Sequence, residues 1–463
     1  MRIYTVFSSP NGNYVYDRNC NKIFKVSKEE AILLSTNNQS NIEWEKFRKY
    51  TQHGLLCESS VKEIEHPESD YLQHSIQHRT KQIVLQVTQN CNLRCEYCVY
   101  SGRYDNRQHT NREMTLDIAY SAIEYLEKHS DELGEVIIGF YGGEPLLRFE
   151  FIKKCVEYAK RVISNREVRF TITTNGTLLT NDIASYLVEN NFAVIISLDG
   201  DQSEHDKYRK YANGKGTFSD IIKNIEDILI RVPEFADIIT INAVMNPQNE
   251  YYKVKNFFEN NRLFNQININ LVPVDDNSSK DRIVFDDRFS IQRNYDYFIL
   301  LLAMIGKIDK NDVSRFMIIR EKVIQNNYKH MKYSSKLGSK EHHGGPCLPG
   351  VKRLFVTVDG ELYPCERVPE TSTEVKLGEI STGIDLTQAL KILNVGKVTS
   401  ESCKNCWAMS LCKMCIRYAI EDSCISKEKK LSHCYDTRVN ALNDLKEICL
   451  LKENNYNFEE YGE

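Results

Sequence analysis

The sequence lacks an excess of charge of either sign, a long hydrophobic run and a secretion signal. Its 60 Lys and Arg residues nearly balance 64 Asp and Glu residues, for a net charge of −4, so the cationic field that drives nonspecific nucleic-acid binding is not expected. The longest apolar run, residues 298–305, is shorter than the roughly 18 residues of a membrane span and is typical of a buried helix. The first residues, MRIYTVFSSPNGNYVYDRN, show no basic stretch followed by an apolar segment and a cleavage site. We therefore expect a cytoplasmic protein that binds neither nucleic acid nor membrane.

Repeats of fixed period and low-complexity tracts are also absent, whereas cysteine is abundant. The 463 residues suggest about three domains, which are large enough to form hydrophobic cores without disulfide bonds. The 15 cysteines therefore do not predict a disulfide scaffold. In a reducing cytosol, many cysteines are more typical of metal binding or catalysis.

The hydrophobic pattern predicts the strands and helices of the first 275 residues. Residues 1–80 contain three strand-like runs, RIYTVF, NYVYD and KIFKV, and a helical pattern over residues 27–34, which together predict a small three-stranded meander with helices. From residue 81, strand-like runs alternate with amphipathic stretches; the six runs are IVLQVT, EVIIGFY, VRFTITT, AVIISL, IITINAVM and NININLVPV. This alternation predicts parallel βαβ units, closed or partly closed into a barrel.

The remainder of the chain has a different pattern. A polar stretch at residues 275–282 ends the barrel, a helical stretch follows over residues 286–332, and the linker YSSKLGSKEHHGG leads into a cysteine-rich tail with short strands and little helical period. We interpret the tail as a metal-held domain. The predicted fold class is therefore α/β, a partial (β/α)6 TIM-like barrel, with segments 1–80, 81–280, 281–340 and 341–463.

Three cysteines follow the first barrel strand in the run CNLRCEYC: Cys91, Cys95 and Cys98. In barrels of this kind the chemistry lies at the carboxyl ends of the strands. Soft thiolates select zinc, copper(I) or iron–sulfur clusters. A four-iron cluster held by three thiolates keeps one iron free of protein ligands, as catalysis requires. A zinc site is the alternative interpretation.

The loops after the next strands carry further candidates for the same site: Gly142, Gly143, Glu144, Ser197, Asp199 and Arg209. The two glycines would let a ligand approach the backbone, and Glu144 could hold an ammonium group. Ser197 and Asp199 could bind ribose hydroxyls, and Arg209 could bind a carboxylate. Each motif alone is also typical of an ordinary turn or loop. Because they follow successive strands, together with TTNGTLL after the third, they predict one site.

The sequence at this point resembles the radical S-adenosylmethionine (SAM) superfamily, over residues 81–275. The resemblance depends on CNLRCEYC with its aromatic Tyr97, on GGEP at 142–145 and on SLDG at 197–200. It implies that the three cysteines hold a 4Fe-4S cluster whose open iron binds SAM, and that an electron from a donor such as flavodoxin or ferredoxin releases a 5′-deoxyadenosyl radical. It also implies that Gly143 and Glu144 contact the methionine amine, and that Ser197 and Arg209 contact ribose and carboxylate.

Eight further cysteines cluster in the tail: Cys347, Cys365, Cys403, Cys406, Cys412, Cys415, Cys424 and Cys434. Eight thiolates suffice for two fully ligated 4Fe-4S clusters, and their spacing resembles the SPASM domain of peptide-modifying radical enzymes. The resemblance implies one auxiliary cluster on Cys347, Cys365 and Cys415, and a second on Cys403, Cys406, Cys412 and Cys434. Cys424 is additional, and either completes the first cluster or leaves one of its irons open. A zinc site on the two C-x2-C pairs is the alternative, but it leaves the other four cysteines without a role.

Several other residues allow two interpretations. The isolated cysteines are typical of small buried hydrophobes; they are Cys20, Cys57, Cys155 and Cys449. His342 and His343 are either metal ligands or polar loop residues. Glu366 follows Cys365, where sulfatase-maturing relatives carry an acidic residue implicated as a base, and it is either such a base or a local ion-pair partner.

The SPASM resemblance implies a peptide or protein substrate. Residues 1–80 then resemble the winged-helix-like domains that bind a leader peptide by strand addition, although a structural cap is the alternative. Residues 281–340 would be a helical bridge, and 341–463 the SPASM domain. The run GPCLPGVKRLFVTVDGELYPCERV resembles maturases of cysteine-rich peptides, which implies thioether formation from substrate cysteines in a precursor peptide. The alternatives are a formylglycine-forming anaerobic sulfatase maturase and a zinc-stabilised peptide-binding protein.

Overall fold

The computed structural model describes residues 1–463 except 37–41, 105–106, 276, 278, 281–282, 286, 334–335 and 459–463. Parts of the predicted polar stretch, the first residue of the predicted helical stretch and part of the linker therefore lie outside the described residues. No helix within the described ranges is long and apolar enough to cross a membrane.

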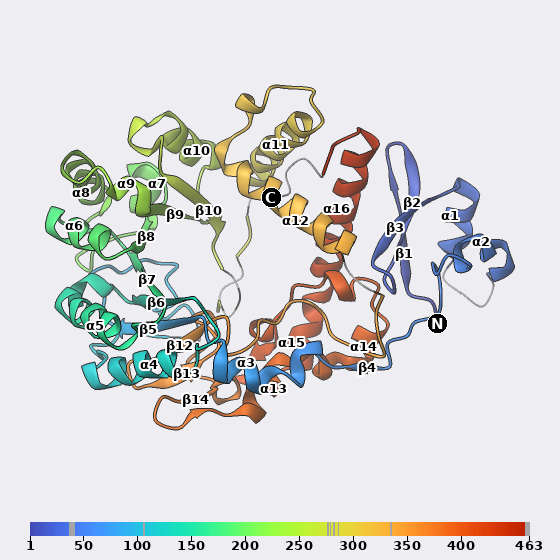
Figure 1. Ribbon diagram of the computed structural model, residues 1–463. Helices are drawn as coiled ribbons and strands as arrows, with labels where there is room; N and C mark the ends of the chain where they lie inside the picture. Colours follow the sequence, from blue (N-terminus) through green and yellow to red (C-terminus); the bar gives the residue numbers. More distant parts are fainter. Residues whose placement is uncertain are drawn as a thin grey trace.

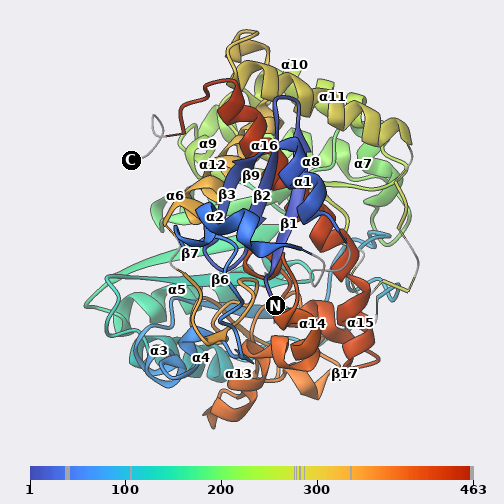
Figure 2. The same cartoon turned by 90° about the vertical axis from the view of Figure 1, so that its right-hand side faces the viewer.

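The N-terminal segment is the predicted meander. Strands β1 (Tyr4–Ser9), β2 (Gly12–Asp17) and β3 (Lys22–Val26) are antiparallel neighbours in that order. Helix α1 (Lys28–Leu34) begins at Ser27, whose hydroxyl accepts from the Glu30 N–H while the Glu30 carboxylate accepts from the Ser27 N–H, the capping box that the sequence favours. Helix α2 (Arg48–Thr51) completes the segment. Figure 2 shows it on the outside of the molecule, beside the last long helix.

The six predicted barrel strands are confirmed and are parallel. They are β5 (Gln82–Thr88), β6 (Glu135–Gly142), β7 (Glu167–Thr174), β8 (Phe192–Ser197), β9 (Ile239–Met245) and β10 (Asn268–Pro273), paired in chain order. Figure 1 shows the intervening helices on the outer face of the sheet. They are α4 (Leu116–Lys128), α5 (Phe149–Val162), α6 (Asn181–Glu189), α7 (Gln202–Tyr208), α8 (Phe218–Arg231), α9 (Phe235–Ile238) and α10 (Tyr251–Asn260).

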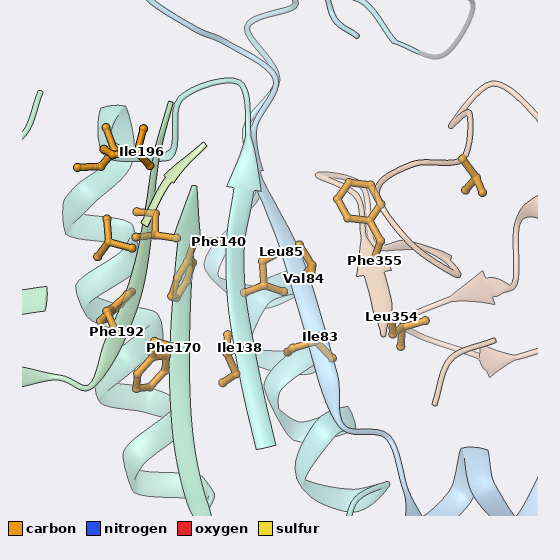
Figure 3. Close-up of a cluster of buried hydrophobic side chains, with 14 of the residues drawn as sticks. Ile83, Val84, Leu85, Ile138, Phe140, Phe170, Phe192, Ile196, Leu354 and Phe355 are labelled. Carbon is orange, nitrogen blue, oxygen red and sulfur yellow. The ribbon is translucent and has the colours of Figure 1, made fainter. Parts of the chain in front are cut away.

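The barrel is only partly closed, because the outer edge of β5 pairs with a strand from the cysteine-rich tail. Strand β12 (Leu354–Val356) lies parallel to β5, and the sheet continues through β13 (Glu361–Tyr363), β14 (Gly378–Glu379) and β15 (Gly383–Ile384). The result is one ten-stranded sheet with β10 at its other edge. Figure 3 shows buried side chains of both parts along this sheet, including Leu85 of β5, Phe140 of β6 and Phe355 of β12.

The predicted helical stretch consists of two helices, α11 (Asp287–Met304) and α12 (Ile318–Tyr333). They are separated by a turn in which Gly306 has a φ of +69°, a conformation that favours glycine. The prediction that residues 298–305 form a buried helix is only partly right. Leu300 and Met304 are buried, but Phe298 on the same helix is 54% exposed, because α11 buries only one of its faces.

The tail contains more helix than the sequence predicts. Its helices are α13 (Leu386–Leu393), α14 (Ser400–Lys404), α15 (Lys427–Ser432) and α16 (Cys434–Glu453). The prediction of little helical period is wrong for α16, a 20-residue helix. Its first turns are polar, and the buried positions Ala441, Leu445 and Ile448 recur at helical spacing only in the second half.

Shorter elements connect these parts. Helix α3 (Leu72–His78) precedes β5, β4 (Glu63–Ile64) pairs with β11 (Lys340–Glu341), and β16 (Ile420–Glu421) forms a hairpin with β17 (Cys424–Ile425). The meander is attached to the end of α16 through one carboxylate. Glu453 accepts hydrogen bonds from the Ser9 hydroxyl (2.5 Å), the Asn11 N–H (3.3 Å) and the Tyr14 hydroxyl (2.7 Å).

Phe355 tests the junction of β12 with β5. Its ring is fully buried, with the Tyr141 ring centroid at 6.3 Å. Phe355→Ala should lower the free energy of unfolding by about 3–5 kcal/mol, since a buried phenylalanine would leave a cavity. Anaerobic denaturant unfolding measures this. Phe298→Ala, at the exposed position on α11, is the matched control and should change it by no more than about 0.5 kcal/mol; equal effects of the two substitutions would contradict the junction's role.

Candidate functional site

The three cysteines after β5 lie together in one loop. The Cys91 sulfur accepts from the Leu93 N–H at 3.4 Å, and the Cys98 sulfur accepts from the Tyr100 N–H at 3.5 Å. Burial raises the pKa of Cys91 and of Cys95 to about 12, and the charges of Cys95 and Cys98 add to the effect at Cys91, which shows that the sulfurs are neighbours. Thiols in such a place become thiolates when a metal binds them. Three soft donors with N–H groups directed at their sulfurs fit an iron–sulfur cluster.

Gly142 and Gly143 allow the loop after β6 to lie directly against the start of the cysteine loop. A Cβ atom at Gly142, where φ is +136°, would lie 2.2 Å from the carbonyl oxygen of Thr88, and one at Gly143 would lie 2.0 Å from that of Asn90. The Gly143 N–H donates to Thr88 O at 2.8 Å, and the Glu144 N–H donates to Asn90 O at 2.9 Å. The sequence predicted room for a ligand at these glycines. In the structure the chain's own backbone fills that space, and the glycines position the cysteine loop.

Glu144 is fully buried and already has three donors. Its carboxylate accepts from the Leu146 N–H (3.0 Å), the Thr174 hydroxyl (2.7 Å) and the Asn175 N–H (2.7 Å). Burial raises the pKa of Glu144 to about 6, so the group is ionised at neutral pH. It ties the end of β6 to the end of β7. Its predicted contact with an ammonium group stays a prediction.

Asp199 and Arg209 form a buried pair beside Cys95. Asp199, which is fully buried, accepts from Arg209 Nε at 2.9 Å, from the Val244 N–H at 2.9 Å and from the Tyr97 hydroxyl. Burial alone would lower the pKa of Arg209, but the charge of Asp199 holds it well above its usual value. The Nη1 atom of Arg209 lies 4.0 Å from the Cys95 sulfur.

This geometry gives Asp199 a structural role. Its oxygens accept from Arg209, from Tyr97 and from a backbone N–H, so it orients these two side chains; its predicted contact with a ribose hydroxyl stays a prediction. Ser197 ends β8 and is half-buried. Sequence reasoning gave no role to Asn175, in the run TTNGTLL after β7. Its amide donates to the side-chain oxygen of Asn92 at 2.8 Å and lies 3.8 Å from the Cys91 sulfur.

Four cysteines of the tail line a single cavity of about 220 Å³. They are the predicted second set, Cys403, Cys406, Cys412 and Cys434, and His343 and Arg438 also line the cavity. This is the set that the SPASM resemblance implied, and its binding of a cluster stays a prediction. Among the described residues, no three Cys, His, Asp or Glu side chains are placed as they would be around a single metal ion.

The other predicted set of tail cysteines, Cys347, Cys365 and Cys415, is less enclosed. Burial, the charge of Glu366 and the charge of Cys415 raise the pKa of Cys365 to about 11. Burial also raises the pKa of Cys415, with a contribution from Cys347, so these three sulfurs are neighbours. Cys424 lies on the exposed β16–β17 hairpin. Its predicted membership of this set stays a prediction.

The structure decides between the two interpretations for some of the residues that the sequence left open. Glu366 forms the ion pair, with Arg353 Nη1 2.6 Å from its Oε1 atom, while its Oε2 atom is buried without a hydrogen-bond partner among the described residues. His342 accepts from the Gly396 N–H at 2.7 Å. Of the isolated cysteines, Cys155 and Cys449 are buried as predicted, whereas Cys20 and Cys57 are half-buried.

Comparison with known proteins finds similarity to radical SAM enzymes. The family model described as "Radical SAM superfamily" matches residues 85–251. The chain is 30% identical over 344 residues to a cysteine-type anaerobic sulfatase-maturating enzyme of Clostridium novyi, which covers 72% of this chain and 86% of that protein. It is 31% identical over 178 residues to the radical SAM cyclopropyl synthase TigE of Paramaledivibacter caminithermalis, covering 36% of this chain and 35% of that one. The solved structure "Native anSMEcpe with bound AdoMet and Cp18Cys peptide" superposes with a TM-score of 0.58 at 21% identity, covering 81% of this chain and 99% of the other.

A substitution of Gly143 tests how the cysteine loop packs against the loop after β6. Gly143→Ala should lower the free energy of unfolding by about 1–3 kcal/mol and speed proteolysis within residues 89–113, because the new methyl group would overlap the carbonyl of Asn90. Thermal unfolding and limited proteolysis measure the two effects. Gly134→Ala is the control, since its Cβ would meet nothing within 4 Å. Cleavage of both variants at the rate of the parent would contradict this role.

Proposed function

Because this chain belongs to the radical SAM superfamily and is an enzyme of that class, we propose that it modifies a peptide with the help of SAM and a 4Fe-4S cluster. Cys91, Cys95 and Cys98 would hold the cluster, a fit supported by their neighbouring sulfurs and the N–H groups directed at them. When bound, the cluster and SAM supply a 5′-deoxyadenosyl radical that takes a hydrogen atom from the substrate.

The surrounding residues would hold the cofactor in place. Arg209, oriented by Asp199, presents a buried positive charge next to Cys95, where the carboxylate of SAM would find a partner. Ionised Glu144 fixes the ends of β6 and β7, from which Asn175 reaches the Cys91 sulfur. Ser197 at the end of β8 remains our candidate for a ribose contact.

The observation that carries the proposed peptide substrate is a cavity of about 350 Å³ beside β3. It is lined by the β3 residues Lys22, Ile23, Phe24 and Lys25, and by side chains of α12 and α16. Within the described meander β3 is an edge strand, and an edge strand next to an apolar groove is a site for strand addition. Lys22 and Lys25 are exposed, so an extended leader peptide with acidic residues fits this site.

A second cavity supports a route from this groove to the barrel. It has a volume of about 690 Å³ and is also bordered by α12 and α16, with Leu271 of β10 and Tyr251 among its other wall residues. Asn294, Asn440 and Asn443 contribute side-chain amides to its wall, which can bond to peptide groups. A precursor held at β3 would pass along these two helices towards the open edge of the barrel.

Thioether formation is the reaction we propose first. A substrate carbon would lose a hydrogen atom and a substrate cysteine would lose its thiol proton as the carbon–sulfur bond forms, and one electron must then leave the peptide. The two cysteine sets of the tail are the proposed sites for the auxiliary clusters that accept it. The second candidate is formylglycine formation. It is favoured by the similarity to the Clostridium novyi sulfatase-maturating enzyme and by the partnerless Oε2 atom of Glu366 next to Cys365.

Metal analysis after anaerobic purification tests the cofactor assignment. We expect about 12 irons and 12 sulfides per chain, as three clusters require. Cys95→Ala should abolish cleavage of SAM, whereas Cys406→Ala should retain part of it. Cys155→Ala, which removes a buried cysteine of the barrel core, is the control and should keep the full iron content. One or two zincs without sulfide would instead support the zinc-stabilised binding protein.

Binding and mass spectrometry test the peptide assignment. With a small precursor peptide encoded beside the gene, Lys22→Glu/Lys25→Glu should weaken binding about tenfold, or about 1.4 kcal/mol, and added salt should reduce the difference. Lys28→Glu/Lys62→Glu, which reverses two exposed lysines outside the groove, is the matched control.

The product distinguishes the two reactions. After anaerobic co-expression, a thioether keeps the cysteine sulfur and removes two hydrogen atoms from the peptide, whereas formylglycine made from cysteine loses the sulfur. Unchanged precursor, together with modification of a sulfatase peptide, would overturn the first candidate in favour of the second.

A further inference from the structure

Lys430 on α15 is fully buried and has no acidic partner among the described residues. Its side-chain nitrogen lies 2.7 Å from the Thr399 hydroxyl and 3.9 Å from the Cys403 sulfur, and these are the polar contacts that the described residues give it. The Thr399 hydroxyl in turn lies 3.2 Å from the Cys403 sulfur. The charge of Lys430 also acts on Cys412 and Cys434, where it opposes the effect of burial on the thiol pKa. The Lys430 ammonium therefore lies beside Cys403, one of the four cysteines that line the 220 Å³ cavity.

A buried ammonium group needs a negative charge close to it. Moving such an ion out of water costs several kcal/mol even after the protein relaxes, and a neutral hydroxyl and a thiol do not offset that cost. The missing negative charge has to come from the sulfurs themselves, as thiolates bound to a metal cluster.

Other polar groups around the cavity support the same conclusion. His343, 1% exposed, lines the cavity, and neither of its ring nitrogens has a hydrogen-bond partner among the described residues. Arg18 is fully buried and donates to the carbonyl oxygens of Lys404 (2.6 Å) and Cys406 (3.5 Å), in the same cysteine loop. Hydrogen-bonding groups and positive charge thus lie at the cavity wall, in His343 and Arg438, and close to it, in Arg18, an arrangement suited to an anionic group within the cavity.

We propose that Lys430 is a positioning residue whose positive charge raises the reduction potential of the cluster held by Cys403, Cys406, Cys412 and Cys434. The inference rests on the proposed function in that these cysteines hold an iron–sulfur cluster. A cluster gains negative charge when it is reduced, so a nearby buried cation favours the reduced form, and in the low dielectric of the interior the effect is large. Arg438 also lines the cavity but is only half-buried, so solvent screens it more strongly.

The test is a redox titration monitored by electron paramagnetic resonance. The parent is the full chain with Cys91→Ala, Cys95→Ala and Cys98→Ala, which leaves only the auxiliary clusters to titrate. In this parent Lys430→Met should move the midpoint potential of one auxiliary signal to a more negative value, and Lys430→Arg should restore it towards that of the parent. Lys427→Met removes an exposed lysine from the same helix and should leave both midpoints unchanged. Lys430→Gln serves as the neutral variant if the methionine protein does not fold.

Iron and sulfide are counted in every protein before titration, so that loss of the clusters can be distinguished from the absence of an effect of Lys430 on their potential. A parent with about eight irons and eight sulfides supports the auxiliary clusters; equal midpoints for parent and neutral variant would then overturn the role of Lys430 alone. A parent without sulfide would overturn both that role and the proposed clusters. A midpoint that shifts in the Lys427→Met protein as much as in the Lys430→Met protein would also overturn the proposal, since the effect would then not depend on the buried position.

Discussion

The pairing of β12 with β5 is the constraint on which the arrangement of this molecule depends. Leu354, Phe355 and Val356 align with Ile83, Val84 and Leu85, so the first barrel strand has a strand of the cysteine-rich tail on its outer side. Polar contacts also connect the region of β5 with the tail. The Gln86 amide donates to Glu370 at 2.7 Å, and Arg107, almost fully buried, pairs with Glu370 and donates to the carbonyl of Glu366 at 2.5 Å. The cysteine loop after β5 and the Cys365 region are therefore connected through a single sheet and not only through a linker.

The sequence predicted well those features that depend on local pattern. The six parallel strands and the three-stranded meander follow from hydrophobic periodicity. The set Cys403, Cys406, Cys412 and Cys434, which lines one cavity, was implied by the resemblance to the SPASM domain. The sequence could not predict features that depend on distant contacts. No local sequence pattern indicates that β12, a three-residue strand, pairs with β5. The structural roles of Asp199 and Gly143 could not be predicted for the same reason, because their partners Arg209 and Asn90 are defined only by the folded chain.

Buried charge is used in two different ways around the cysteines. Beside the first loop, Asp199 accepts from Arg209, from Tyr97 and from a backbone N–H, all of them groups of the chain itself. Beside the 220 Å³ cavity, the contacts that the described residues give the Lys430 ammonium are with a hydroxyl and a thiol. The buried charge of Arg209 thus has an anionic partner within the chain, whereas that of Lys430 lacks one among the described residues.

Helix α16 has a different contact at each of its two ends. Its first residue, Cys434, lines the cavity of the second cysteine set, and its last residue, Glu453, holds the meander through Ser9, Asn11 and Tyr14. At 1.5 Å per residue its 20 residues form a rod about 30 Å long. Figure 1 shows α16 rising from the rest of the tail alongside the meander. The Cys434 sulfur and the Glu453 carboxylate therefore lie at opposite ends of one helix, and the length of that helix sets the spacing between the cavity and the attachment of β1 and β2.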